Sequence, residues 1–432
     1  MAGYPSNTIQ DLSIKFFEFT ALGLSTVALT PVAWFKITAF LTTAGLPWLM
    51  YASARNFFCH GESRERIALI SALLGTLYWW NSLPREMFFY GMIGFPVAAY
   101  VSIWGISLFY RLVAGNPPLG WIHLGWLLFV IAILPLHVQS LVIFLPWMIA
   151  LVILQLRRIN GKLLVWMMAP LSLAILVNLV WLVPAFNHRH DDISSAIVTQ
   201  LPLFASTDPL TFLFDYLGAK GYWTFRPSFI EKGFRLALLI LGALGIIELI
   251  KKDNRNVAVI IISGASGLFL ITYFGAFIPL IAAWQPLRFK VPLDLFLAIG
   301  AAYGIDPWFT GQERFRFHLV PVVISLGALA FAINVLHTES TAKLRARTEM
   351  RPQIAAIIDW VARETPREAR VLFEESGDET GFVYDGIYLS AFLPYLTGRQ
   401  LIGGPINLYN DRHHFAEFHS GKLFRRDIDR IP

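Results

Sequence analysis

The stretch VAVIIISGASGLFLITYFGAFIPL, residues 257–280, decides the fold class because its 24 positions carry no charged side chain. A helix of about 20 mostly apolar residues is long enough to cross the hydrocarbon core of a bilayer. Lys251, Lys252 and Arg255 stand just before the stretch. We therefore predict that this segment is a transmembrane helix with a basic flank.

Comparable apolar runs recur through the first 338 residues, and they predict a polytopic α-helical membrane protein with about ten transmembrane helices. The expected spans are 33–54, 67–83, 88–110, 120–136, 139–156, 163–186, 234–250, 257–280, 291–308 and 317–337. The apolar stretch 12–30 contains Lys15 and Glu18 and is followed by Pro31. We expect it to lie in the membrane interface, and an eleventh full span is the alternative.

Composition agrees with a membrane body and a polar tail. Hydrophobic residues make up 56% of the 432 residues and charged residues 15%, against about 25% in soluble proteins. Of the 64 charged residues, 27 lie in 339–432. This excludes a disordered or ordinary cytosolic protein. The single cysteine, Cys59, excludes an intrachain disulfide and a cysteine-based zinc site.

Basic residues in short loops predict the orientation, because cytoplasmic loops carry the excess of Lys and Arg. One set of loops contains Arg55, Arg64, Arg66, Arg111, Arg157, Arg158, Lys162, Lys251, Lys252, Arg255, Arg314 and Arg316. We assign these loops to the cytoplasmic side and expect the chain to lie in the inner (cytoplasmic) membrane. The N-terminus, the loop 187–233 and the tail then lie outside the cytoplasm. The basic charge is an orientation signal, so we expect no nucleic-acid partner.

The tail, residues 339–432, is predicted to be a small soluble α/β domain, incomplete at its end. Apolar residues spaced for one helix face indicate an amphipathic helix over 350–364. Strands are expected over 369–374, 381–389 and 399–402, with a helix over 390–397. The chain thus divides into 1–32, an outer-loop remnant with an interfacial helix; 33–338, the membrane body; and the tail.

The segment WQPLRFKVP, residues 284–292, places two cations before a span on the side that is poor in basic residues. Arg288 offers a planar fork for phosphate oxygens, Lys290 adds a point charge, and the helix start favours an anion. We interpret Arg288, Lys290 and Gln285, with Arg85 from another outer loop, as phosphate-binding residues. Interfacial snorkelling, or an i,i+4 pair of Lys290 with Asp294, remains open.

Three other outer regions contain polar side chains with two interpretations each. Glu86 is a general base or metal ligand, or else part of a local salt bridge. His137, beside Gln139 at a tight turn, is a substrate contact or an interfacial group. No cofactor is certain, but a divalent cation would be bound by the loop residues His188, His190, Asp191 and Asp192, which equally suit a solvated loop.

Aromatic residues in the loop 187–233 add a further substrate-binding hypothesis. Tyr222 and Trp223 have flat rings that stack on the face of a sugar. The same residues suit the aromatic belt at a membrane interface, which is the alternative.

Several short motifs, in order, resemble a known family. They are Gly3-Tyr4-Pro5; Tyr90-Gly91 through Phe95-Pro96 and on to Phe109-Tyr110-Arg111; Gln285-Pro286 with Arg288-Phe289; and Leu393-Pro394, Thr397-Gly398-Arg399 and Gly403-Gly404-Pro405. Together they resemble the bacterial pyruvoyl-tetrahydropterin-synthase-related membrane proteins of the GT-C glycosyltransferase superfamily. The name implies no pterin chemistry.

The resemblance implies transfer of a sugar from a polyprenyl-phosphate donor to an extracytoplasmic glycan, lipid or protein acceptor. The family's catalytic acid lies in the first outer loop, before the Gly-Tyr-Pro run. Here that run stands at Gly3-Tyr4-Pro5, so the acid has no matching position, and we expect a fragment or a chain without its catalytic base. The alternatives are a non-catalytic transporter or flippase for envelope biogenesis, or an inactive relative.

Overall fold

The structure is a computed structural model that describes residues 15–27, 30–58, 63–89, 92–115, 120–156, 161–187, 204–217, 229–252, 254–282, 284–310, 327, 329–334, 352–372, 393, 396–402, 418–419, 422–423 and 426–427. The chain divides into two compact units. One comprises 11–180 and 201–335, and the other comprises 1–10, 181–200 and 336–432. The first contains most of the apolar helices, and the second contains the polar tail.

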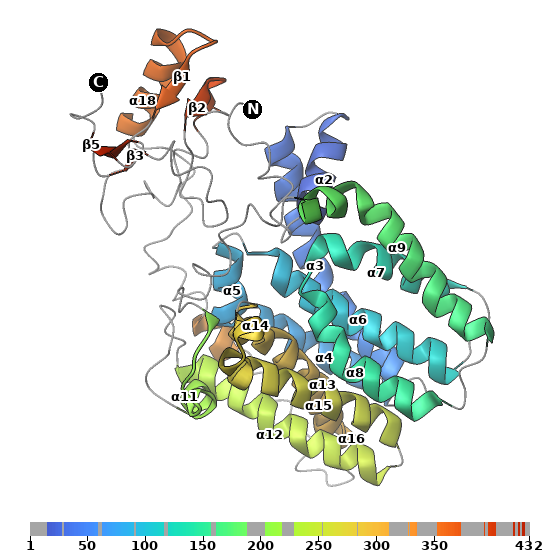
Figure 1. Cartoon of the computed structure of the whole chain (residues 1–432). Helices are drawn as coiled ribbons and strands as arrows, with labels where there is room; N and C mark the ends of the chain where they lie inside the picture. Colours follow the sequence, from blue (N-terminus) through green and yellow to red (C-terminus); the bar gives the residue numbers. More distant parts are fainter. Residues whose placement is uncertain are drawn as a thin grey trace. The chain divides into compact units, whose positions relative to one another are not determined.

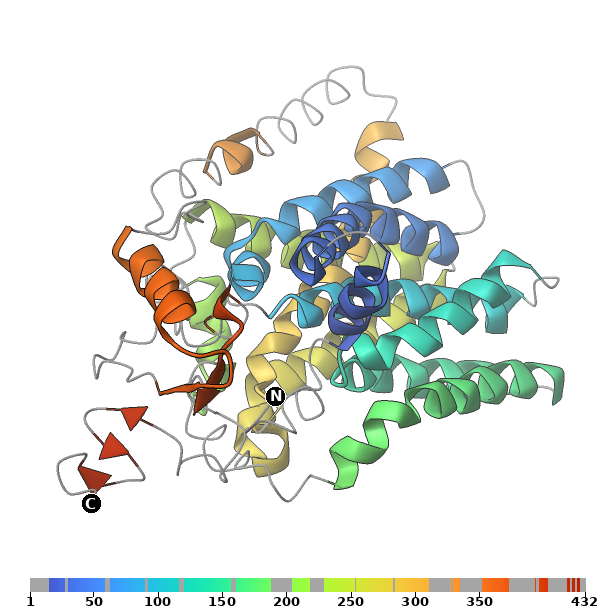
Figure 2. The same cartoon turned by 90° about the horizontal axis from the view of Figure 1, so that it is seen from above.

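The described residues between 15 and 187 are mostly helical. The helices are α2 (Lys15–Ser25), α3 (Pro31–Phe57), α4 (Arg64–Trp79), α5 (Ser82–Phe89), α6 (Gly94–Gly115), α7 (Trp121–Leu136), α8 (Ser140–Gln155) and α9 (Gly161–Asn187). α3 packs against both α4 and α6, and the three lie side by side in both views (Figures 1 and 2). Thr30 caps α3, since its hydroxyl accepts the Ala33 N–H at 3.2 Å, and Pro31 begins the helix.

Residues 204–310 supply the second group of helices. They are α11 (Thr211–Tyr216), α12 (Phe229–Lys251), α13 (Arg255–Phe274), the 3₁₀ turn η4 (Gly275–Phe277), α14 (Pro279–Ala282), the 3₁₀ turn η5 (Pro286–Phe289), α15 (Lys290–Ile305) and α16 (Pro307–Thr310). α15 is buried at every position except Gly304. A helix that is apolar on all sides belongs in the core, and α12, α13 and α4 pack around it.

Glycines bring α12 and α15 to backbone contact. A Cβ added to Gly245 would lie 1.8 Å from the carbonyl oxygen of Gly300. One added to Gly304 would lie 2.9 Å from the backbone nitrogen of Gly245. Small residues allow this approach in membrane bundles, where close packing replaces the hydrophobic drive of water. The contact therefore fixes how α15 meets its main neighbour.

Four described helices are long and apolar enough to cross a membrane, namely Gly94–Ala114, Leu163–Val183, Phe229–Lys251 and Arg255–Phe277. In α9, Val165, Leu176 and Val180 are each more than 60% exposed. An apolar surface of this kind is stable against lipid and not against water. A helical membrane fold is thus confirmed at this level, while the number of about ten spans stays a prediction.

Several expected spans differ from the helices found. In place of 67–83, α4 ends at Trp79, and in place of 257–280, α13 ends at Phe274. The span expected from residue 88 begins instead at Gly94, after α5 has ended at Phe89. Pro96 then lies in the first turn of α6, where its missing N–H costs no helical hydrogen bond. The span 291–308 ends at Ile305, and Pro307 begins α16. Most of the expected span 317–337 lies outside the described residues.

The tail unit contains α18 (Pro352–Glu364), β1 (Arg370–Leu372), β2 (Gln400–Ile402), β3 (Phe418–His419), β4 (Lys422–Leu423) and β5 (Arg426–Asp427). β1 and β2 are parallel, whereas β3, β4 and β5 are antiparallel. Arg399 caps the end of α18, because its guanidinium donates to the carbonyl oxygens of Ala362 at 2.6 Å and Thr365 at 2.9 Å. The expected helix 350–364 and strands 369–374 and 399–402 are confirmed, and the strand 381–389 lies outside the described residues.

Candidate functional site

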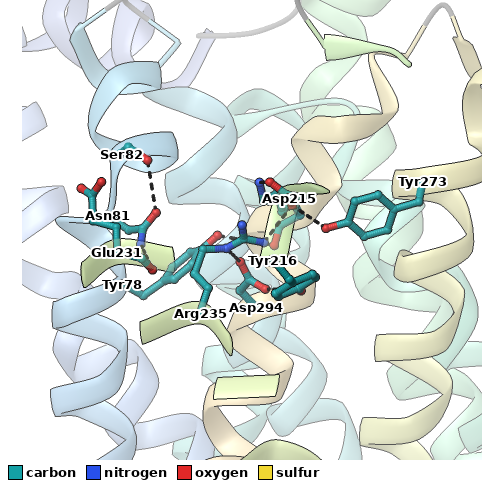
Figure 3. Close-up of polar contacts among 10 residues, drawn as sticks. Tyr78, Asn81, Ser82, Asp215, Tyr216, Glu231, Arg235, Tyr273 and Asp294 are labelled. Carbon is teal, nitrogen blue, oxygen red and sulfur yellow. Dashed lines mark hydrogen bonds and ion pairs between the residues drawn. The ribbon is translucent and has the colours of Figure 1, made fainter. Parts of the chain in front are cut away.

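A network of four buried charges joins α11, α12 and α15 (Figure 3). Arg235 of α12 donates from Nε to Asp294 of α15 at 2.8 Å, and from Nη2 to Asp215 of α11 at 3.1 Å. Lys290, the first residue of α15, pairs with the second oxygen of Asp215. None of the four side chains is more than 9% exposed. Two cations and two carboxylates make the network neutral, as burial requires.

Tyrosines complete the hydrogen bonding of both carboxylates. The Tyr273 hydroxyl donates to Asp215 at 2.7 Å, and the Tyr216 hydroxyl donates to Asp294 at 3.1 Å. The guanidinium of Arg235 lies over the ring of Tyr216, 4.6 Å from its centre. Burial, followed by the nearby Asp294, raises the pKa of Tyr216 well above its usual range. Tyr216 therefore stays a hydrogen-bond donor at neutral pH.

Asp215 is the member of the network that lies between α9 and α12, in the segment expected from the sequence to be an outer loop. Burial alone raises the pKa of its carboxyl, but Arg235 and Lys290 outweigh burial and bring the pKa below its usual range. An ionised carboxylate that is held by two cations has little affinity for a further proton. The geometry thus makes Asp215 an anionic contact and a poor general base.

Helical periodicity sets up the two rows of charge that meet here. Glu231 and Arg235 are one turn apart on α12, and Lys290 and Asp294 are one turn apart on α15. The pair of Lys290 with Asp294 considered from the sequence is not formed. Asp294 pairs with Arg235, and Lys290 reaches Asp215. The Tyr78 hydroxyl donates to the Lys290 carbonyl at 3.4 Å.

A second polar pair lies next to the network. Arg85 of α5 approaches Glu231 at 3.6 Å, and the Asn81 side-chain amide donates to the Glu231 carbonyl oxygen at 3.4 Å. Asn81 and Glu231 lie beside Arg235 in Figure 3. Because Glu231 precedes Arg235 by one turn, the two groups of charges belong to the same end of α12. We call this region the polar end of the bundle.

An apolar cavity of about 420 Å³ lies among α3, α4 and α5 and has Arg85 in its wall. Its lining residues are Phe40, Thr43, Ala44, Leu46, Pro47, Thr76, Trp79, Trp80, Arg85 and Phe88. Arg85 is the only charged residue among them. Phe40, Trp80 and Phe88 are 68%, 45% and 39% exposed, so the wall reaches the apolar surface of the bundle. The cavity suits a hydrocarbon chain with an anionic end.

Arg288 lies in a different setting from Lys290. Its guanidinium lies over the ring of Phe204, 4.7 Å from the centre, and Nη2 is 3.5 Å from the sulfur of Met92. Burial, together with the charge of Arg288, lowers the pKa of His137 to about 3. The Nδ1 atom of the neutral His137 ring accepts the Gln139 backbone N–H at 3.2 Å.

The residues expected to bind phosphate are thus divided between two settings. His137 and Gln139 meet the 284–288 segment, since the Gln139 side chain donates to the Trp284 carbonyl at 3.0 Å. Gln285 lies in that segment with a left-handed backbone, φ 55°. Lys290 and Arg85 instead face carboxylates, Asp215 and Glu231 respectively.

Other expected site residues are not described. Glu86 belongs to α5, but its side chain is outside the described part. The remaining six are also outside it: His188, His190, Asp191, Asp192, Tyr222 and Trp223. Within the described ranges, no group of three or more His, Cys, Asp or Glu side chains is arranged to hold a metal ion. The divalent cation considered from the sequence therefore stays untested.

Sequence reasoning missed Arg235, Asp215 and Tyr273. Arg235 did carry a signal, because it stands just inside the apolar run 234–250, where a charge is costly unless it is paired. Asp215 stands among aromatic and apolar residues in FLFDY, residues 212–216, a pattern that indicates a carboxylate in an apolar environment. Tyr273 had no distinguishing signal within its apolar helix.

In comparisons with known proteins, no family model matches this sequence and no curated protein shows significant similarity to it.

Proposed function

We propose that this chain is a GT-C-type membrane glycosyltransferase-like protein that binds a polyprenyl-phosphate-linked sugar at the outer face of the inner membrane. The sugar would pass to an extracytoplasmic glycan, lipid or protein acceptor. The observation that supports this best is the apolar cavity with Arg85 in its wall. A polyprenyl phosphate is a long hydrocarbon with one anionic end, and the cavity offers aromatic walls for the first and a guanidinium for the second.

Arg85 has Glu231 as a charged neighbour at the wall of the cavity. Its Nη1 lies 3.6 Å from Glu231, which is longer than a hydrogen bond. A phosphate oxygen that approaches Arg85 from the cavity would form a shorter, charge-assisted contact. Glu231 would keep the Asn81 amide as a neighbour, through its backbone carbonyl.

Binding of polyprenyl phosphate to the protein in lipid nanodiscs tests the proposal. Isothermal titration calorimetry measures the affinity directly. We expect Arg85→Gln to weaken binding by about tenfold or more, as loss of a charged contact to phosphate does. Arg55→Gln is the control, because Arg55 pairs with Glu65 and is 39% exposed. Equal affinity of Arg85→Gln and the unmodified protein would overturn the proposal. A screen of polyprenyl-phosphate sugars then identifies the donor.

The proposal includes about ten spans, with the α/β tail outside the cytoplasm. Single cysteines placed at Arg363 in the tail and at Lys252, in a chain without Cys59, test this orientation. A membrane-impermeant maleimide should label the first in intact spheroplasts and the second only after lysis. The opposite pattern would refute the orientation.

A transporter or flippase is the second candidate, and the buried charge network favours it. Paired charges within a bundle are typical of transport pathways. Proteoliposomes distinguish the two functions. Movement of a labelled polyprenyl-phosphate sugar across the bilayer without transfer to an acceptor would support transport, and transfer would support the enzyme.

A further inference from the structure

Three bundle helices each direct one hydrogen-bond donor at Asp215. They are Arg235 of α12, Tyr273 of α13 and Lys290 of α15. Two charged donors and one neutral donor around a small anion are the arrangement that proteins use to bind phosphate. Figure 3 shows Arg235 and Tyr273 approaching Asp215 from different sides. The bundle therefore presents an anion site, and the occupant is a carboxylate of the same chain.

The charge balance shows what removal of that carboxylate would leave. Arg235 and Lys290 carry two positive charges, and Asp294 and Asp215 carry two negative charges. Without Asp215, the remaining three side chains have a net charge of +1. Arg235 would keep its orientation because Asp294 still accepts from its Nε. A preorganised cationic site of this kind favours an incoming anion.

The segment that carries Asp215 is short and packs against the bundle mainly through aromatic side chains. Phe204 lies on the Arg288 guanidinium, and the ring of Phe212 meets that of Phe269 edge-on, with centres 5.7 Å apart. Leu213 and Leu217 are 41% and 66% exposed. Release of this segment, residues 204–217, would uncover Arg288 and the two cations that hold Asp215. It would break the contacts that Phe212 and Tyr216 make with the bundle, so the incoming ligand must compensate for their loss.

We infer that Arg235, Lys290 and Tyr273 form a phosphate-binding site, and that the phosphate of a ligand displaces the Asp215 carboxylate and releases the 204–217 segment. The ligand class is a phosphate ester. Only the choice of a lipid headgroup as its source rests on the proposed function, because free phosphate has the same chemistry.

Affinity for inorganic phosphate and for polyprenyl phosphate, measured on the full chain in nanodiscs, tests the site. We expect Asp215→Asn to bind phosphate about tenfold more tightly or better, since it removes the competing charge from a poorly screened position. Asp208→Asn is the matched control. It makes the same charge change in the same segment, and an amide oxygen can still accept the Leu210 N–H that Asp208 accepts at 2.8 Å.

A cysteine at Thr211 reports on displacement without altering the site. Thr211 is 2% exposed, and Cys59 can be replaced by serine to leave one thiol. We expect saturating ligand to speed maleimide labelling of Thr211→Cys severalfold, and the combined Thr211→Cys, Lys290→Gln variant to lose this response. This labelling experiment also tests the displacement of Asp215 if the Asp215→Asn variant does not fold.

The outcomes distinguish free phosphate from a lipid headgroup as the ligand, and this inference from the proposed function. A response to both ligands assigns free phosphate, and a response to polyprenyl phosphate alone assigns a lipid headgroup. Unchanged affinity in Asp215→Asn for both ligands, or labelling that saturating ligand does not alter, overturns the inference. A phosphate response together with an inert Arg85→Gln variant would refute the proposed function and leave this site standing.

Discussion

Arg235 and Asp294 face each other between α12 and α15, joined by a hydrogen bond of 2.8 Å, with exposures of only 3% and 0%. Arg235 belongs to α12 and Asp294 to α15, so each buried charge depends on the other helix for its partner. Replacing such a pair by two apolar residues can be neutral, whereas removing one partner leaves an uncompensated buried charge. The pair thus couples the placement of the two helices.

Asp294→Asn should lower the thermal midpoint of the purified protein markedly. It leaves Arg235 with one full carboxylate, and loss of a buried partner costs about 3–5 kcal/mol of unfolding free energy. Glu248→Gln, which breaks an exposed pair with Lys252, should cost at most about 1 kcal/mol. Thermal unfolding in detergent compares the two. Similar midpoints for both variants would show that the buried pair does not hold the helices.

Gly245→Ala should also destabilise the protein, by about 1–3 kcal/mol, because the new methyl would overlap the Gly300 backbone and force α12 from α15. Gly233→Ala, in the same helix but with open space at its Cβ, should be neutral or stabilising by up to about 1 kcal/mol. The same unfolding assay measures both. Equal stability of the two variants would contradict the close approach.

His137 should make stability depend on pH. Burial and then Arg288 lower its pKa to about 3, against 6.5 in the unfolded chain. Below pH 6.5 the unfolded state therefore binds a proton that the folded state does not, so this contribution to stability is lost as pH falls from 6.5 toward 3. Between pH 6.5 and 5 the loss is about 2 kcal/mol.

The difference between the unmodified protein and His137→Gln isolates this effect. Asp215 contributes in the same direction only as pH falls below its ordinary pKa of 3.8. The two proteins should therefore diverge between pH 6.5 and 5. Parallel curves across that range would show that His137 titrates normally in the fold.

Arg288→Ala should abolish sugar transfer from a polyprenyl-phosphate donor and leave membrane insertion intact. Its guanidinium lies over the ring of Phe204 and beside the sulfur of Met92, within the bundle rather than in a loop that sets orientation. Lys252→Ala, just beyond the far end of α12, is the control. Transfer assays and the amount of protein in the membrane are the two measurements. An unchanged transfer rate would remove Arg288 from the mechanism.

The sequence predicted the positions of several helices, because apolar runs are a local property. The expected spans 120–136 and 139–156 correspond to Trp121–Leu136 and Ser140–Gln155. The break between α5 and α6 was not predicted, since a glycine-containing apolar stretch reads as one run. The breaks depend on backbone geometry that composition does not report.

The site was predicted only in part, because partners in an ion pair are chosen by tertiary packing. Lys290 and Asp294 have the spacing of a helical pair, yet each is paired with a residue far away in sequence. Arg235 and Asp215 acquire their roles only when α11 meets α12. No periodicity contains that information, whereas the cation-rich start of α15 was visible at once.

The backbone contact at Gly245 and Gly300 has a mechanical consequence. With no side chains between them to yield, α12 and α15 cannot slide or rotate past one another without a collision of main chains. The two helices therefore behave as one rigid unit that holds Arg235, Asp294 and Lys290 at fixed separations. Any movement that admits a ligand must then come from the segments that pack against these two helices. The helix pair itself keeps the same geometry before and after the ligand enters.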